Sequence, residues 1–209
     1  ERKTALATGA TGFLGTHLSH SLLQQGYRVL ARARSSKNTS ADDRVRDVLR
    51  TVGDFPYKNL KVFDGDISQP ELGLNEVSLG TASTVDEVWH CAASLSFQQE
   101  DRDEIFRINV DGTRNVVQIV ERTPARRLQH VSTAYVAGKR ADIAPETEIY
   151  VGQSFRNAYE ESKCQAELLI AAASARGAIQ SSIYRPSLVI GDSTTGAVRP
   201  LSGGSGRRS

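Results

Sequence analysis

A glycine-rich segment near the start of the chain limits its possible folds more than any other feature. The segment, Thr8-Gly-Ala-Thr-Gly-Phe-Leu-Gly15, follows a short apolar run and opens an amphipathic stretch. Glycine permits a tight turn and close approach of the backbone to a ligand, and the N-terminus of a helix offers unpaired N–H groups to phosphate. A glycine triplet can also form a tight turn alone, but this strand–turn–helix context predicts a dinucleotide-binding loop. We expect the dinucleotide to contact Gly9, Thr11, Gly12, Phe13, Leu14 and Gly15.

A second motif lies far along the chain, where Tyr159 and Lys163 are separated by four residues. On a helix this spacing places the phenol and the ammonium on one face, where the cation can stabilise the phenolate and lower the tyrosine pKa from its usual value of about 10. We therefore expect Tyr159 to act as a proton donor. A Tyr and a Lys at helical spacing can also be an ordinary surface pair, and it is the combination with the glycine loop that favours catalysis.

Strands and helices are predicted to alternate, which favours a single α/β domain with a doubly wound parallel sheet, the Rossmann fold. The expected strands are Lys3 to Thr8, Arg28 to Ala33, Leu60 to Phe63, Glu87 to His90, Leu128 to Ser132 and Ile179 to Tyr184. The expected helices are Phe13 to Gln25, Asp42 to Val52, Asp101 to Glu121 and Tyr159 to Arg176. In such a sheet the ligand lies across the carboxyl ends of the strands.

Composition excludes several classes of protein. The net charge is +2, but basic and acidic residues are interspersed and aromatic residues make up only 6%, so we expect no nucleic-acid partner. No apolar run approaches the roughly 20 residues of a membrane span. Cys91 and Cys164 have neither metal-ligand nor disulfide-framework spacing, so no metal site is expected. A reducing cytoplasm fits this cysteine content, and no secretory signal opens the chain.

Family resemblance rests on seven motifs in a characteristic order. They are the glycine loop, Asp64-Gly-Asp-Ile67, His90-Cys-Ala-Ala93, Asn109-Val-Asp-Gly-Thr113, Val131-Ser-Thr-Ala-Tyr135, Tyr159-x-x-x-Lys163 and Tyr184-Arg-Pro-Ser-Leu-Val-Ile-Gly191. From Lys3 to Gly191 the chain resembles the extended short-chain dehydrogenase/reductases. Within them it is most similar to the fatty acyl-CoA reductases and terminal thioester reductases, the male sterility type. The pointers are Leu72-Gly-Leu74, the run His90-Cys-Ala-Ala-Ser-Leu-Ser-Phe97, and Tyr135-Val-Ala-Gly138.

Domain boundaries follow from this resemblance. Residues 1–191 are expected to form the NADP-binding Rossmann domain with its catalytic residues. Residues 192–209, which end in Gly-Gly-Ser-Gly-Arg-Arg-Ser, have the composition of a linker. They are interpreted as a linker-like tail or a remnant of a substrate-binding domain, most of which is absent from this sequence.

The resemblance implies a catalytic group of Thr133, Tyr159 and Lys163. The resemblance places the catalytic hydroxyl four residues before Ala137, which favours Thr133 over the neighbouring Ser132. Because side chains alternate along a strand, only one of the two can face the cleft. Thr133 would hydrogen-bond the substrate carbonyl, Tyr159 would deliver a proton, and Lys163 would hold the nicotinamide ribose. Asn109 resembles the helix asparagine near the lysine, although a purely structural hydrogen bond fits equally well.

Cofactor choice is indicated at the end of the second strand. NAD-binding folds place an acidic residue there, whereas this chain has Arg32 and Arg34. A guanidinium pairs with a 2′-phosphate, so NADP(H) is the expected cofactor and Arg34 the expected contact; solvated arginines in a basic turn are the alternative. Asp66 and Ile67 resemble the residues that contact the adenine in this family. Alternatively, Asp66 is a turn aspartate that caps a loop. Further contacts are expected from Ala92, Ala93, Pro186 and Val189, where packing would also favour such small or apolar residues.

The activity implied is NADPH-dependent reduction of an acyl thioester, from coenzyme A or a carrier protein, to an aldehyde or alcohol. One alternative is an extended dehydrogenase or epimerase acting on a nucleotide sugar, a steroid or another alcohol or ketone. A second is a non-catalytic NADP-binding protein. Monomer and homodimer both stay open as the oligomeric state.

Overall fold

The computed structural model describes residues 2–96, 101–193 and 196 of the chain. Phe97 of the motif that begins at His90, and almost all of the expected tail, lie outside these residues. The predicted doubly wound parallel sheet is confirmed. Six strands are hydrogen-bonded in the order β3-β2-β1-β4-β5-β6, and every neighbouring pair is parallel.

All six predicted strands are present, each within one residue of its expected bounds. The strands are β1 (Thr4–Thr8), β2 (Arg28–Ala33), β3 (Leu60–Asp64), β4 (Glu87–His90), β5 (Arg127–Val131) and β6 (Gln180–Tyr184). The main helices are α1 (Phe13–Gln24), α2 (Ala41–Arg50), α3 (Glu76–Ala82), α4 (Arg102–Phe106), α5 (Gly112–Arg122) and α6 (Ala158–Ala175). No helix in the described ranges is long and apolar enough to cross a membrane.

Two helical features differ from the prediction. The short helix α3 was not expected; Asn75 caps it by accepting a hydrogen bond from the Ser78 backbone N–H at 2.9 Å. The expected helix from Asp101 to Glu121 is interrupted by a π-helical turn, Arg107–Asp111, between α4 and α5. A π-turn inserts one residue into an α-helix and re-aims the side chains that follow, and such turns are frequent at functional sites.

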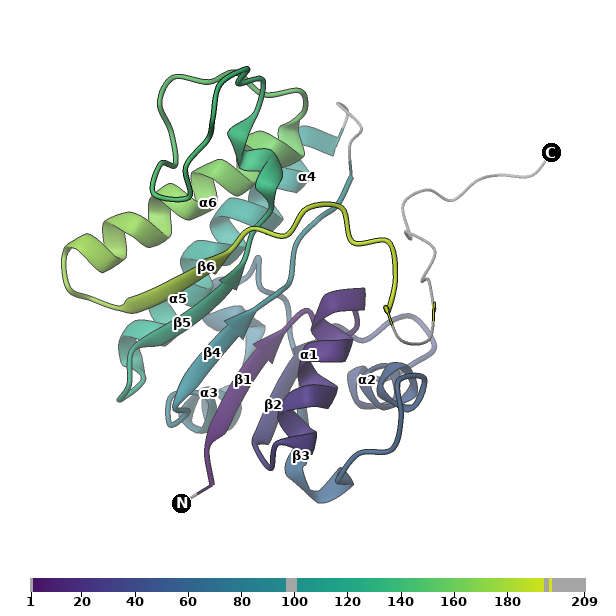
Figure 1. Cartoon of the computed structure of the whole chain (residues 1–209). Coiled ribbons are helices and arrows are strands. Elements are labelled where there is room, and N and C mark those ends of the chain that lie inside the picture. The colour runs from purple at the N-terminus through teal and green to yellow at the C-terminus, as the bar shows by residue number, and fades with distance from the viewer. Residues whose placement is uncertain (1, 97–100, 194–195, 197–209) are drawn as a thin grey trace.

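Side-chain alternation along β1 divides the core between the two faces of the sheet. Ala5 and Ala7 face the layer that contains α1 and α2, where they join a cluster with Leu22 and Leu23. Leu6 faces the opposite layer, where it joins a larger cluster with residues of α5 and α6. Figure 1 shows these helices on opposite sides of the sheet. Because both faces are covered here, β1 has three consecutive apolar residues, Ala5 to Ala7, rather than an alternating pattern.

The carboxyl ends of the strands gather the segments that the sequence singles out. The glycine loop follows β1, residues 91–93 follow β4, residues 132–137 follow β5, and residues 185–193 follow β6. The chain order reverses beside β1, whose neighbours are β2 on one side and β4 on the other. After β6 the chain passes back toward α1, where a carboxylate oxygen of Asp192 lies 3.9 Å from Nδ1 of His17 (Figure 1).

Candidate active site

The glycine loop makes a tight turn that brings β1, α1 and the segment after β4 together. Gly9 has a φ of +76°, and its carbonyl accepts a hydrogen bond from the Gly12 N–H at 2.9 Å. A Cβ on Gly9 would lie 2.5 Å from the backbone N of Ala92, and one on Gly15 would lie 2.1 Å from the Gly9 oxygen. Both glycines are therefore required by the packing of the protein itself.

Gly12 differs from the other two glycines of the loop. It is the N-cap of α1, and a Cβ there would meet a single atom within 4 Å, the Gly9 oxygen at 3.3 Å. The protein therefore leaves space beside Gly12 at a helix N-terminus, where phosphate is favoured. Its loop neighbours Thr11 and Phe13 are half-buried, and Leu14 is exposed. This open cradle fits a pyrophosphate.

Thr133 and Tyr159 meet across two elements. Thr133 follows β5 and is buried, and Tyr159 lies in the first turn of α6, which Asn157 caps by accepting a hydrogen bond from the Glu160 N–H at 2.9 Å. A side-chain hydrogen bond joins the Tyr159 phenol to the Thr133 hydroxyl. Ser132 is also buried, but its hydroxyl has no hydrogen-bond partner among the residues described. The structure thus brings Thr133, rather than Ser132, to the phenol.

The predicted lowering of the Tyr159 pKa by Lys163 is wrong in this structure. Burial raises the pKa of Tyr159; the Thr133 hydrogen bond opposes the shift, and the neighbouring Tyr135 adds to it. Helical spacing places Tyr159 and Lys163 in neighbouring turns, but it does not fix where the long lysine side chain ends. The phenol therefore keeps its proton at neutral pH, as a proton donor requires.

Lys163 is buried, and its ammonium contacts β5. Nζ donates a hydrogen bond to the Val131 backbone oxygen at 2.8 Å and lies 3.3 Å from Nε2 of His130. Burial lowers the pKa of Lys163 to about 8, while Glu167 and Cys91 act in the opposite direction. The ammonium is therefore the main form at neutral pH, and it loses its proton at far lower pH than an exposed lysine does.

Asn109 connects the segment after β4 to α6. It lies in the π-helical turn and is buried. Its side-chain oxygen accepts from the Ser94 N–H at 2.7 Å, and its amide nitrogen donates to the Ser94 oxygen at 3.2 Å and to the Ser162 hydroxyl at 2.9 Å. These contacts give Asn109 the structural role named as the alternative; a role toward the cofactor stays a prediction.

Asp66 and Ile67 follow β3. One Asp66 carboxylate oxygen accepts from the Ser68 N–H at 2.9 Å, as in the loop-capping alternative, and the other lies 3.5 Å from Nη1 of Arg34. Burial alone would raise the pKa of Asp66, but the Ser68 hydrogen bonds and the nearby arginines hold it below its usual value. The Ile67 side chain is buried in the core against Gly112, and its contact with an adenine stays a prediction.

Arg32 was named beside Arg34 at the end of the second strand, but its burial was not predicted. Arg32 is only 4% exposed, and its Nε and Nη2 have no hydrogen-bond partner among the residues described. Arg34, by contrast, has a side chain that is 58% exposed, and its backbone oxygen accepts a hydrogen bond from Arg44. Burial lowers the pKa of Arg32 to about 10, which still leaves it charged at neutral pH. Its position inside the buried strand β2 was the available signal.

The residues predicted to contact the nicotinamide half of the cofactor lie in the segments after β4 and β6. Ala92 and Ala93 are half-buried, and the backbone of Ala92 packs against Gly9. The Pro186 oxygen accepts a hydrogen bond from the Ala134 N–H at 2.9 Å, which ties the segment after β6 to the loop that carries Thr133. Val189 is 38% exposed. In the described part of the chain no group of His, Cys, Asp or Glu side chains is arranged to hold a metal ion.

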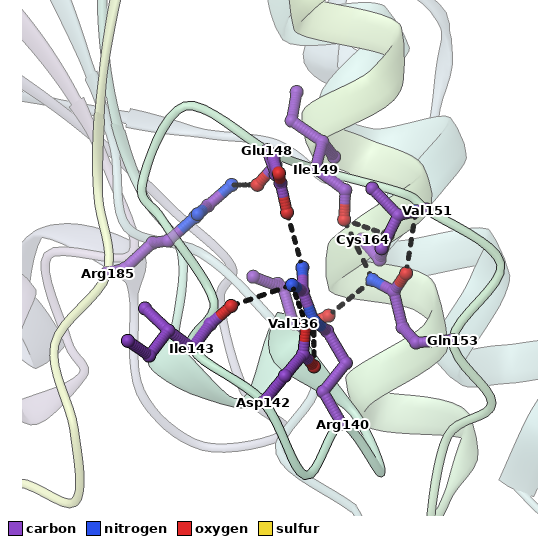
Figure 2. A network of polar contacts seen from close by, with 10 residues as sticks. All are labelled: Val136, Arg140, Asp142, Ile143, Glu148, Ile149, Val151, Gln153, Cys164 and Arg185. Atoms are coloured by element: carbon purple, nitrogen blue, oxygen red, sulfur yellow. Dashed lines mark hydrogen bonds and ion pairs between the residues drawn. The ribbon is translucent and has the colours of Figure 1, made fainter.

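A polar network fixes the long loop between Thr133 and α6 (Figure 2). Nη1 of Arg140 lies 2.6 Å from a Glu148 carboxylate oxygen, and Nη2 of Arg185 donates to the Glu148 backbone oxygen at 2.9 Å. The same Arg185 atom lies 2.6 Å from the carboxylate of Glu167, which is fully buried on α6. Arg185 therefore joins the segment after β6 to the loop and to the helix that carries Tyr159.

The chain is similar to a known protein family and to several known proteins. The family model described as male sterility protein matches residues 7–206. Peramine synthetase A of Epichloe festucae (strain Fl1) is 31% identical over 93% of the chain, and the match takes up 7% of that protein's length.

Two solved structures are also similar. The terminal R domain from the myxalamid PKS-NRPS biosynthetic pathway is 32% identical, with a TM-score of 0.84 over 95% of the chain and 52% of that domain. The reductase (R) domain of a non-ribosomal peptide synthetase from Mycobacterium tuberculosis is 27% identical, with a TM-score of 0.73 over 93% of the chain and 50% of that domain. The chain therefore spans about half the length of these domains.

Proposed function

Because this chain belongs to the male sterility protein family, within the extended short-chain dehydrogenase/reductases, we propose that it forms the cofactor-binding and catalytic part of an NADPH-dependent reductase of acyl thioesters. The observation that carries this proposal is that the Thr133–Tyr159 hydrogen bond and the buried Lys163 ammonium both lie at the carboxyl end of β5, on the same edge of the sheet as the glycine loop. A protein that only bound the dinucleotide would not need a buried phenol, hydroxyl and ammonium there.

The protein's own groups fit a dinucleotide that carries an extra phosphate. Gly12 leaves room for a pyrophosphate at the start of α1. Arg32 offers two buried nitrogens, Nε and Nη2, that have no hydrogen-bond partner among the described residues, and Arg34 lies near the same strand end. An arginine donates paired hydrogen bonds to phosphate oxygens, whereas a ribose hydroxyl would leave most of this capacity unused. These contacts support NADPH over NADH. When bound, the cofactor supplies hydride to the carbonyl carbon of the substrate.

The side chains of this chain perform the proton chemistry. Thr133 donates a hydrogen bond to the carbonyl oxygen, and Tyr159 transfers its phenolic proton to that oxygen as negative charge develops there. Lys163 holds the cofactor ribose, and the Thr133 hydroxyl that is hydrogen-bonded to the phenol stabilises the phenolate that Tyr159 becomes. The product of this step is a hemithioacetal, which releases a thiol to give the aldehyde; reduction of the aldehyde to an alcohol would use a second NADPH.

The type of protein to which the relatives belong favours an acyl thioester over other carbonyl substrates. A peptide synthetase and two R domains of such assembly lines are similar to nearly all of this chain. We therefore propose a carrier-protein-bound acyl group as the substrate, with acyl-coenzyme A as the other thioester source. A nucleotide sugar, steroid or simple ketone is the competing substrate class.

The substrate class can be tested with the full-length enzyme and NADPH. An acyl thioester on a carrier protein, the same acyl group on coenzyme A, a simple ketone and a nucleotide sugar are supplied separately. The proposal expects NADPH oxidation and release of one thiol per aldehyde formed with a thioester. Turnover of the ketone or the nucleotide sugar with no thiol released from either thioester would contradict it.

A further inference from the structure

His130 is a buried titratable residue in β5 that the proposed reaction does not use. Its side chain is fully buried, and Nε2 lies 3.3 Å from Nζ of Lys163. The other contact of that ammonium in the described part of the chain is the Val131 backbone oxygen, 2.8 Å away. One strand, β5, thus supplies both of the hydrogen-bonding contacts of the Lys163 ammonium in these ranges.

The chemistry of the pair fixes the position of a proton. An ammonium has three hydrogens to donate and no lone pair with which to accept. Whenever Lys163 is charged, Nε2 of His130 must therefore be the acceptor. Burial, with the nearby Lys163 and His90, holds the pKa of His130 well below its usual value, so the ring is neutral and carries one proton. That proton must then lie on Nδ1.

Nδ1 of His130 has no hydrogen-bond partner among the residues described. Buried polar atoms are nearly always hydrogen-bonded, so a ring retained for packing alone would be expected to have both nitrogens paired. The neighbouring His90 shows that arrangement: its Nδ1 lies 2.7 Å from the Thr8 hydroxyl, and its Nε2 lies 3.1 Å from the Thr113 hydroxyl. The two rings are 5.0 Å apart between centroids, yet His130 alone is turned toward the lysine.

We propose that His130 is a positioning residue for Lys163: as an imidazole protonated on Nδ1, it accepts a hydrogen bond from the ammonium and holds that charge at the carboxyl end of β5. This inference rests on the proposed function, which gives Lys163 its role toward the ribose. Other groups that act on the ammonium are Glu167, one turn further along α6, and Cys91, after β4, and both favour the charged form. His130 adds an uncharged acceptor from the β5 side.

The proton on His130 can be located by nitrogen-15 NMR of the histidine-labelled chain, without cofactor, substrate or turnover. The two nitrogens of a neutral imidazole differ strongly in chemical shift according to which one carries the proton. We expect a neutral ring protonated on Nδ1 throughout pH 5 to 8, identified by the loss of its signals in His130→Gln. A proton on Nε2, or a ring that titrates within this range, would overturn the inference.

Two substitutions distinguish the hydrogen bond between Lys163 and His130 from the packing of the His130 ring. His130→Gln keeps an amide oxygen that can take the place of Nε2, whereas His130→Leu fills the space without an acceptor. The readout is the affinity for NADPH as a function of pH, because loss of the ammonium's proton should weaken ribose binding. In His130→Leu we expect the midpoint, the pH at which NADPH affinity is half lost, to fall by about one unit. A shift of this size corresponds to the free energy of a hydrogen bond to a charged group. His130→Gln should keep the wild-type midpoint.

His90→Gln is the matched control, since it removes an equally buried imidazole that does not contact Lys163 and should leave the midpoint in place. A wild-type midpoint in His130→Leu, or equal shifts in all three variants, would refute positioning by His130. This outcome is distinct from failure of the proposed function. If the Nδ1 proton and the shifted midpoint are found while no acyl thioester is reduced, the function is wrong and the positioning of Lys163 stands.

Discussion

Arg32 is the residue whose replacement best separates cofactor choice from folding. Its buried guanidinium has two nitrogens without a hydrogen-bond partner in the described part of the chain, and a bound anion would offset the cost of their desolvation. We expect Arg32→Met to weaken NADPH binding roughly tenfold or more, at least about 1.4 kcal/mol. NADH binding and the melting temperature should not fall. Calorimetric titration with both nucleotides and a thermal melt test this.

Arg28→Met provides the control, because Arg28 lies at the exposed amino end of the same strand. Wild-type protein should bind NADPH about tenfold more tightly than NADH. Arg34→Ala should reduce this preference less than Arg32→Met does, because the Arg34 side chain is mostly exposed and its charge is screened. Equal affinity of the wild-type protein for the two nucleotides would remove both arginines from the proposed phosphate contact.

Gly12 and Gly15 should respond differently to an added side chain. Gly12→Val should abolish NADPH binding without unfolding the protein, because its side chain would occupy the space left for the pyrophosphate. Gly15→Ala should lower the melting temperature, because its Cβ would lie 2.1 Å from the Gly9 oxygen. A thermal melt and a titration on each variant distinguish the two effects. Full NADPH binding by Gly12→Val would refute the loop assignment.

Among the elements, the strands with apolar runs between clear boundaries, such as β1 and β2, were predictable from that pattern. The short helix α3 was missed since its seven residues include Gly80 and leave Val77 78% exposed, so no apolar face marks it. The π-helical turn around Asn109 was missed because a single inserted residue does not disturb helical periodicity visibly.

Tertiary contacts explain what the sequence could not reveal about the site. Spacing placed Tyr159 and Lys163 in neighbouring turns of α6, but the contact of Lys163 with β5 depends on a partner 32 residues away in the chain. The raised pKa of Tyr159 depends on burial, which a sequence motif does not specify. Likewise, Arg32 and Arg34 are two residues apart, and only their packing distinguishes the buried guanidinium from the exposed one.

Arg185 should be essential to the contact between α6 and the segment after β6. Its guanidinium pairs with the fully buried carboxylate of Glu167 at 2.6 Å. Arg185→Leu would leave a buried charge without its partner, so we expect the free energy of unfolding to fall by about 3–5 kcal/mol. Urea unfolding measures this. Arg140→Leu is the comparison, because its partners Asp142 and Glu148 are partly exposed and a smaller loss is expected. Equal losses would contradict the distinction.

At the scale of the whole molecule, Lys163 links stability to pH. Its pKa is lowered from 10.5 to about 8 on folding, mainly by burial. Between these values the unfolded chain binds more protons than the folded one, so the contribution of Lys163 to the free energy of unfolding rises with pH. We expect Lys163→Met to be more stable than the wild type at pH 7 by on the order of 2 kcal/mol. Urea unfolding at pH 7 and pH 10 should show this advantage shrinking; a constant difference would contradict a buried ammonium.

Tyr159 is proposed to donate the proton when hydride reaches the acyl carbon. The most direct test of this step is the single-turnover rate of NADPH oxidation by the full-length enzyme with an acyl thioester, for wild type and Tyr159→Phe, with NADPH affinity measured in parallel. We predict a loss of rate of roughly a hundredfold or more, with NADPH affinity nearly unchanged, because the variant lacks the proton needed in the transition state. A Tyr159→Phe enzyme that reduces the thioester at the wild-type rate would contradict the account.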